Sequence, residues 1–304
     1  MTTGLFLAFI AFHKWRYISL LTRAVAIVME PEEAHEAPGV LIKRSIGSEK
    51  LILLDPVLLL DHLGVDTNAG ATPVIGFPRH PHRGIETLTY VFAGKMKHKD
   101  SMGTEDTVEE NESQWMTAGG GLFHEEMVET TDGVHNSLQI WFNLPAAEKM
   151  KPPHYQPGRN ADIPIVTLAN GGVVRVVAGE FNGTKGAFQE IAVRPHYFDV
   201  RLPAGAEVTL PALPGHMAFA YLYEGAAAFG EPETLIEASR LVVFTDGEDV
   251  FVSAIQREAR FIYVSAKPLG EPVLQYRSLV MNTVDQMKEA LDDLQKGTFA
   301  KSAA

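Results

Sequence analysis

Cysteine is absent from the sequence of 304 residues. Its absence excludes disulfide bonds, thiolate metal ligands and cysteine nucleophiles, so any metal ion must be bound by nitrogen and oxygen atoms. Clusters of Lys and Arg are also missing, and the formal net charge is −12. Because proteins that bind nucleic acid draw much of their affinity from clustered basic residues, we expect no direct contact with nucleic acid.

The apolar run nearest the N-terminus is too short to cross a bilayer. It spans nine residues, 4–12 (GLFLAFIAF), whereas a transmembrane helix takes about 20. A secretory signal would carry basic residues before such a run and small residues at a cleavage site after it, and neither is evident. We therefore interpret residues 1–22 as an N-terminal extension, and we expect a cytoplasmic protein that is not bound to a membrane.

The composition is that of a soluble globular protein, with 46% hydrophobic and 21% charged residues. Short apolar or alternating segments separated by turns occupy residues 40–142 and again residues 173–267, which is typical of β-sandwiches and barrels. Between them, residues 145–160 contain four prolines and one glycine and show no periodicity. We therefore predict an N-terminal domain at residues 23–150 and a C-terminal domain at residues 151–304.

The two strand-rich regions are similar to each other. Residues 89–94 (TYVFAG) align with residues 220–225 (AYLYEG) at an offset of 131, and a second match follows at an offset of 128. Such a repeat indicates a duplicated structural unit. The chain then ends in a predicted helix, because Thr283 and Gln286 form a capping-box pattern and Gly297 is suited to end the helix.

Two histidines flank a proline in the segment RHPHRGIET, residues 79–87. Side chains at positions i and i+2 of a strand point to the same side, so His80 and His82 are aligned if the segment is extended. The pair therefore resembles half of a metal site. Glu86 follows four residues after His82, but Gly84 between them favours a bulge that would change the phase.

A second cluster follows three glycines in the segment AGGGLFHEE, residues 118–126. His124 and Glu126 share a face by the same alternation, and the glycines permit a tight turn that brings this strand end towards the first pair. Glu126 is the favoured carboxylate, with Glu86 as the alternative. Three imidazoles and one carboxylate suit Fe(II), Mn, Ni, Cu or Zn.

The remaining histidines of this region lack such a pairing. His98, in HKDSMG, is interpreted as a solvated strand end, with a position beside the metal ligands as the alternative. His135, in DGVHNS, is interpreted as structural.

Several blocks of the sequence resemble the pirin family of the cupin superfamily: GFPRHPHRGIETLTYVFAG, QWMTAGGGLFHEEM and EPVLQYRSLVMNT. The resemblance covers residues 23–299. It implies an all-β protein with two antiparallel cupin barrels that face each other and a short C-terminal helix. It also implies one metal ion, usually iron, in the N-terminal barrel. Carried over residue by residue, the ligands of this ion are His80, His82, His124 and Glu126.

The internal repeat extends this interpretation to the second barrel. The offset of 131 places Pro211 and Leu213 at the positions of the first two histidines. The offset of 128 places Val252 and Ala254 at the positions of the other two ligands. Because none of these side chains binds metal, we expect the C-terminal domain to be without metal.

The resemblance implies two candidate functions. Some pirins have quercetin 2,3-dioxygenase activity, which predicts a dioxygenase that cleaves a flavonol or a related phenol at a mononuclear Fe(II) site. Glu126 would then accept the proton of the substrate hydroxyl. Eukaryotic members resemble nuclear cofactors of transcription factors, which predicts, as the alternative, an iron-dependent redox-sensing regulator that binds a partner protein. In either case we expect a monomer.

Overall fold

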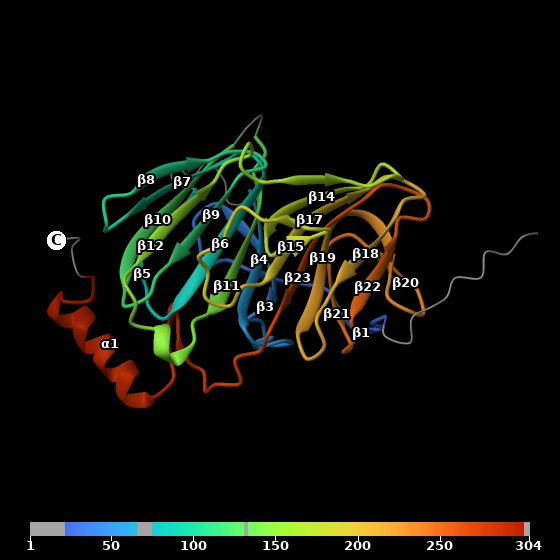
Figure 1. Ribbon diagram of the computed structural model, residues 1–304. Helices are drawn as coiled ribbons and strands as arrows, with labels where there is room; N and C mark the ends of the chain where they lie inside the picture. The colour runs from blue at the N-terminus through green and yellow to red at the C-terminus, as the bar shows by residue number, and fades with distance from the viewer. Residues whose placement is uncertain (1–21, 66–74, 131–132, 301–304) are drawn as a thin grey trace, which may run out of the picture.

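The computed structural model describes residues 22–65, 75–130 and 133–300. Two β-sandwich lobes lie side by side, the first coloured blue to green and the second yellow to orange (Figure 1). The helix α1 (Val284–Lys296) lies on the outer side of the first lobe. The predicted architecture of two cupin barrels with a short C-terminal helix is therefore confirmed. No helix within the described ranges is long and apolar enough to cross a membrane.

The first lobe is built from two antiparallel sheets. The larger sheet has, in spatial order, the strands β12 (His154–Gly158), β9 (Ser113–Thr117), β6 (Ile85–Ala93), β11 (Asn136–Asn143), β4 (Val57–Val65), β3 (Val40–Ile46) and β2 (Glu32–Ala34). The smaller sheet has the strands β5 (Gly76–His82), β10 (Leu122–Glu129), β7 (Lys95–Asp100) and β8 (Glu105–Val108). Side chains of the two sheets meet inside the lobe, where Thr89 donates a hydrogen bond of 3.1 Å to Glu126.

The second lobe repeats this arrangement. Its larger part has the strands β1 (Val25–Met29), β21 (Arg240–Phe244), β19 (Met217–Phe229), β23 (Ala259–Ala266), β17 (His196–Leu202), β14 (Val173–Ala178) and β13 (Ile165–Thr167). Its smaller part has β18 (Glu207–Pro211), β22 (Asp249–Ser253), the end of β19, and β20 (Thr234–Glu237). The strand order matches that of the first lobe, as the internal repeat predicts.

Shorter elements lie between and after these sheets. They are the 3-10 helix η1 (Ala146–Glu148), the pair β15 (Glu180–Phe181) and β16 (Thr184–Lys185), and the pair β24 (Leu274–Tyr276) and β25 (Leu279–Met281). The helix α1 begins and ends as predicted. The Thr283 hydroxyl accepts from the backbone N–H of Gln286, and Gly297 closes the helix at φ 72°.

Aromatic side chains fill the space between the larger sheets of the two lobes. Tyr90 from β6 and Tyr221 from β19 belong to one buried cluster, and Trp115 of the same cluster stacks on Phe142 with 5.3 Å between ring centroids. Burying one such side chain contributes about 1.5–3 kcal/mol. Because this cluster has members in both lobes, it holds the first lobe against the second one.

The first and the last segments of the described residues each pack on the lobe that is formed mainly by the other half of the sequence. β1 pairs with β21 of the second lobe, and the buried Arg23 guanidinium donates hydrogen bonds to four backbone carbonyls there. At the other end, Leu279 forms a parallel bridge with Arg83, directly after β5. The N-terminal segment thus packs on the second lobe, and the C-terminal segment packs on the first lobe. The predicted domain boundary at residues 150 and 151 stays a prediction.

The strand register corrects the alignment of β18 with the first histidine pair. The ladder between β18 and β22 pairs Leu210 with Val250, and both side chains are buried in the apolar core of the second lobe. Pro211 is not part of that core, and Leu213 is 56% exposed. His80 pairs with His124 in the first lobe and Val208 pairs with Val252 in the second, so the alignment at these two positions is wrong by three residues. A slip by an odd number of residues turns each side chain to the opposite face. The residues that do face inward are also apolar.

Candidate metal centre

Strands β5 and β10 place three histidines on the inner face of the first lobe. The strands are antiparallel neighbours, with His124 directly opposite His80. His82 lies on the same side as His80, as the alternation predicts. Gly121 precedes β10 with φ 126°, and a Cβ there would lie 2.8 Å from the carbonyl oxygen of Phe299. The glycine therefore permits the close approach that positions the start of β10.

The Nε2 atoms of these histidines converge on one point. Nε2 of His80 lies 3.0 Å from Nε2 of His82 and 3.0 Å from Nε2 of His124. Two ligands at right angles on one ion, with metal–nitrogen bonds of about 2.1 Å, are also about 3.0 Å apart. Nδ1 of His80 lies 2.9 Å from the carbonyl oxygen of Pro78, which places the proton on Nδ1 and leaves the lone pair on Nε2. The spacing therefore fits adjacent imidazole ligands of a single metal ion.

Burial keeps the rings of His82 and His124 neutral. Burial lowers the pKa of His82 and His124 well below the ordinary value, and neighbouring imidazoles lower both further. The neutral imidazole is the form that binds metal. His80 is only half-buried, so the cluster approaches the protein surface at this residue.

Glu126 is buried inside the same lobe and its carboxylate is held by amides. Gln114 donates to one oxygen at 2.5 Å, and Gln139 donates to the other at 2.6 Å. The ligand atoms of Glu126, His124 and His98 all lie within 4.8 Å of one another. One cluster of donors thus contains Glu126, the other contains the three convergent histidines, and His124 belongs to both.

Glu86, the alternative carboxylate, lies on the face of its strand that points away from the three histidines. It accepts hydrogen bonds from the hydroxyl of Thr117 (2.8 Å) and from the backbone N–H of Ala192 in the second lobe (3.2 Å). Burial raises its pKa above the ordinary value. Glu86 therefore faces the contact between the lobes and not the histidines.

The interpretation of His98 as a solvated strand end is wrong. The side chain is buried, Nε2 lies 3.1 Å from Oδ2 of Asp100, and the ring centroid lies 5.3 Å from that of His124. Burial acts to raise the pKa of Asp100, but hydrogen bonds from His98 and from backbone amides lower it overall. A signal for this burial is present in the sequence. The segment KMKHKD, residues 95–100, alternates lysines with other residues, which is typical of a strand with one face in solvent.

His135 is buried, and its Nε2 lies 2.8 Å from the hydroxyl of Ser137. The structural role that we interpreted for it agrees with this contact, since the residue belongs to neither donor cluster.

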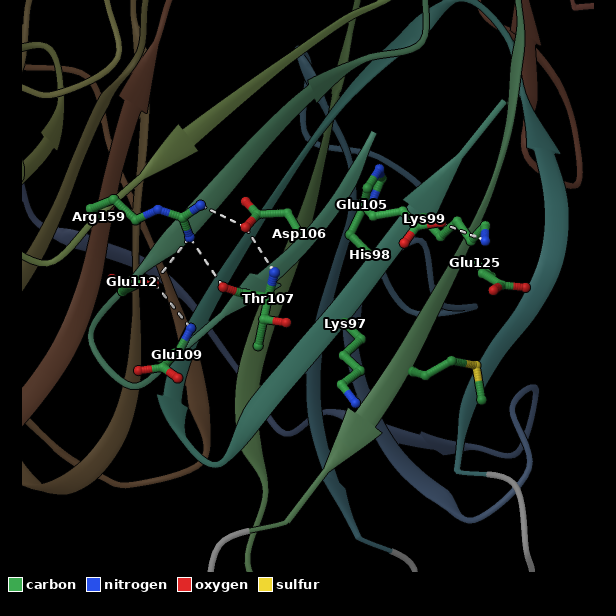
Figure 2. Close-up of a pocket in the computed structure, with 11 residues that line it drawn as sticks. Lys97, His98, Lys99, Glu105, Asp106, Thr107, Glu109, Glu112, Glu125 and Arg159 are labelled. Atoms are coloured by element: carbon green, nitrogen blue, oxygen red, sulfur yellow. Dashed lines mark hydrogen bonds and ion pairs between the residues drawn. The ribbon is translucent and has the colours of Figure 1, made fainter. Parts of the chain in front are cut away.

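A series of close polar contacts that the sequence did not reveal leads from Glu126 towards the surface. Gln114, which donates to Glu126, has its amide oxygen 3.0 Å from the hydroxyl of Tyr155. That hydroxyl lies 2.7 Å from Asp106, and Arg159 donates to Asp106 at 2.6 Å. Figure 2 shows this arginine at the edge of a cavity of about 720 Å³ that His98 also lines. Long-range contacts of this kind are invisible to strand periodicity.

Both lobes match models of known families. Residues 39–142 match the Pirin family model, and residues 197–300 match that of the Pirin C-terminal cupin domain.

The relatives agree with these matches. A protein of Pseudomonas aeruginosa that carries the name putative quercetin 2,3-dioxygenase is 37% identical over 273 residues, which cover 88% of this chain and 94% of the relative. Pirin of Rattus norvegicus is 34% identical over 278 residues, which cover 90% of this chain and 92% of the relative.

The solved structures show the same fold. A crystal structure of quercetin 2,3-dioxygenase from Acinetobacter baumannii superposes with a TM-score of 0.83 at 30% identity, covering 92% of this chain and 99% of the other. The nickel complex of the bacterial pirin YhhW from Escherichia coli superposes with a TM-score of 0.63 at 16% identity, covering 80% of this chain and 98% of the other. At 16% identity, the likeness to YhhW shows only that the two proteins share a fold.

Proposed function

The chain belongs to the pirin family of cupin proteins, and on this premise we propose that it is a metal-dependent dioxygenase that cleaves a flavonol or a related phenol. The observation that carries the proposal is the convergence of three histidines, in which Nε2 of His80 lies 3.0 Å from Nε2 of His82 and 3.0 Å from Nε2 of His124. The names of the dioxygenase relatives from Pseudomonas aeruginosa and Acinetobacter baumannii support the choice of substrate class.

Four residues would hold the metal: His80, His82, His124 and Glu126. Fe(II) is the proposed ion, and Mn, Ni, Cu and Zn are alternatives that the same donors accommodate. When bound, the ion would supply Lewis acidity towards a phenolic oxygen and electrons for the activation of dioxygen. A dioxygenase transfers both atoms of O₂ to its substrate, so no external reductant is required.

The protein's own residues would bind and orient the substrate. The rings of His82 and His124 are buried and therefore neutral, which is the form of imidazole that binds metal. Glu126 is proposed to accept the proton that leaves the substrate hydroxyl. Gln114 and Gln139 hold both oxygens of this carboxylate, so it meets the substrate in one fixed orientation.

Oxygen uptake by the iron-loaded protein tests the proposal. We expect uptake with flavonols or catechols in a panel, loss of uptake in His124→Ala, and retained uptake in Glu86→Gln, because Glu86 faces the second lobe. Absence of uptake with iron-, copper- and nickel-loaded protein across the whole panel contradicts the dioxygenase proposal.

An iron-dependent regulator that binds a partner protein is the second candidate. The series of polar contacts from Glu126 through Gln114, Tyr155 and Asp106 to Arg159 favours it, because these contacts link a proposed metal ligand to surface charges. A net charge of −12 suits a partner with a basic surface. Capture experiments with oxidised, reduced and metal-free protein test it, and identical partners in all three states argue against it.

A further inference from the structure

His98 is held in one orientation by its neighbours. Nε2 lies 3.1 Å from Oδ2 of Asp100, while Oδ1 of Asp100 accepts from the backbone N–H groups of Met102 (2.8 Å) and Thr104 (3.1 Å). An ionised carboxylate only accepts hydrogen bonds, so Nε2 carries the proton of the imidazole. Nδ1 is then left with a lone pair. The ring of Tyr155 packs against that of His98 with 4.6 Å between centroids, which limits rotation.

This lone pair has no partner in the described part of the protein. Nδ1 of His98 is fully buried and makes no hydrogen bond there, although a ring nitrogen of His98 lies within 4.8 Å of the ligand atoms of His124 and Glu126. Nearly all buried polar atoms in proteins have a partner. A buried acceptor beside the cluster of metal-binding donors can therefore take a donor from a molecule bound there.

The same interior contains a second unused group. The hydroxyl of Thr87 is buried and without a hydrogen bond in the described residues. Thr87 lies two positions from Thr89, whose hydroxyl donates to Glu126, so the two threonines share the face of β6 that lines the interior. Unused polar groups thus come from both sheets of the lobe.

We infer that Nδ1 of His98 accepts a hydrogen bond from a hydroxyl group of the ligand that binds beside the metal. His98 would then be a specificity-determining residue and Asp100 the residue that positions it. Compounds with two neighbouring hydroxyl groups, as in catechols, satisfy the metal and His98 together. A phenol with one hydroxyl leaves Nδ1 buried without a donor, and a site built for a hydroxyl discriminates against such analogues. This inference rests on the proposed metal site and its phenolic substrate.

The variant Asp100→Asn tests the tautomer. The amide oxygen of the asparagine would still accept hydrogen bonds from the backbone N–H groups of Met102 and Thr104. The NH₂ group of the asparagine would therefore face Nε2 of His98. Nε2 must then accept, and the proton moves to Nδ1. Long-range ¹H–¹⁵N correlation spectra of the zinc-loaded protein, which is diamagnetic, report which nitrogen is protonated. We expect Nδ1 to be unprotonated in the wild type and protonated in the variant, and a wild-type proton on Nδ1 overturns the inference.

Binding of two probes tests the selectivity. We expect the ratio of the affinities for 4-nitrocatechol and 4-nitrophenol to fall about tenfold in His98→Phe, which keeps a ring against Tyr155 but has no acceptor, in line with the loss of one hydrogen bond in a buried site. Asp100→Asn tests the tautomer alone, because a hydroxyl can also accept a hydrogen bond from a protonated Nδ1.

Glu105→Gln on the exposed edge of β8 is the control and should leave the ratio unchanged. Metal content and circular dichroism are measured for each protein. An unchanged ratio in His98→Phe at full metal content overturns the inference, and so does the absence of catechol binding to the loaded wild type. If the tautomer and the ratio behave as expected while no flavonol is oxidised, the inference stands and the proposed dioxygenase activity fails.

Discussion

The titration of Lys149 offers a sharp test of how the C-terminal segment is attached to the first lobe. Its buried Nζ donates to the carbonyl oxygens of Gly84 (2.8 Å) and Val280 (3.0 Å) and to Oδ1 of Asn143 (2.7 Å). Gly84 follows the first histidine pair, and Val280 belongs to β25. One ammonium group with uncharged acceptors thus joins the two segments, and burial lowers its pKa to about 8.

The direction of the pH effect follows from the two states of this lysine. Its ordinary pKa, which the unfolded chain restores, is 10.5. Between pH 8 and 10.5 the unfolded state binds a proton that the folded state has released, so the free energy of unfolding rises with pH. At about 1.4 kcal/mol per pKa unit, the full interval corresponds to about 3 kcal/mol. Below pH 8 the destabilising effect of burying the charge is present in full.

Unfolding in urea, followed by tryptophan fluorescence, measures this effect because Trp115 and Trp141 lie in the first lobe. We expect the unfolding free energy of the wild type to rise by about 3 kcal/mol relative to that of Lys149→Met from pH 8 to 10.5. Lys151→Met, at a half-buried lysine paired with Glu148, is the matched control and should run parallel to the wild type. Parallel profiles for Lys149→Met and the wild type would refute the reasoning.

Three further outcomes follow from the geometry. His124→Ala should reduce the metal content from one ion per chain to nearly none by elemental analysis, whereas His135→Ala, at a residue outside both donor clusters, should retain it. Glu86→Gln should leave the metal content unchanged, because this carboxylate faces the second lobe, and metal loss would contradict its placement. Arg83→Met removes the hydrogen bonds of the guanidinium to the carboxylate of Asp293 and to the backbone carbonyl oxygen of Phe299. It should lower the unfolding free energy by about 2 kcal/mol in denaturant titrations, and an unchanged midpoint would contradict the role of this ion pair.

Strand alternation was sufficient to group the histidines because it depends only on the period of two. His80 and His82 needed only an extended segment to lie on one side, and His124 and Glu126 needed the same. Alternation also separated Glu86 from Glu126 correctly, since Gly84 breaks the phase at φ 78°. The same rule, applied to the lysines of residues 95–100, would have placed His98 inside the lobe.

Register and long-range pairing required the tertiary structure. The slip at Leu213 arose because loops of different length separate the repeated strands, and a periodic pattern does not count loop residues. The clamp on Glu126 by Gln114 and Gln139 joins three separate strands, so no local pattern contains it.

The amino-acid sequence by itself determined the all-β class, the repeated unit and the faces on which the candidate ligands lie, because these follow from local periodicity and composition. The tertiary structure alone decided the separation of 3.0 Å between the imidazoles and the burial of His98 against Asp100. It also decided that the N-terminal segment packs on the second lobe and that the C-terminal segment packs on the first. These features depend on which strands become neighbours, and that choice is made by packing across the whole chain.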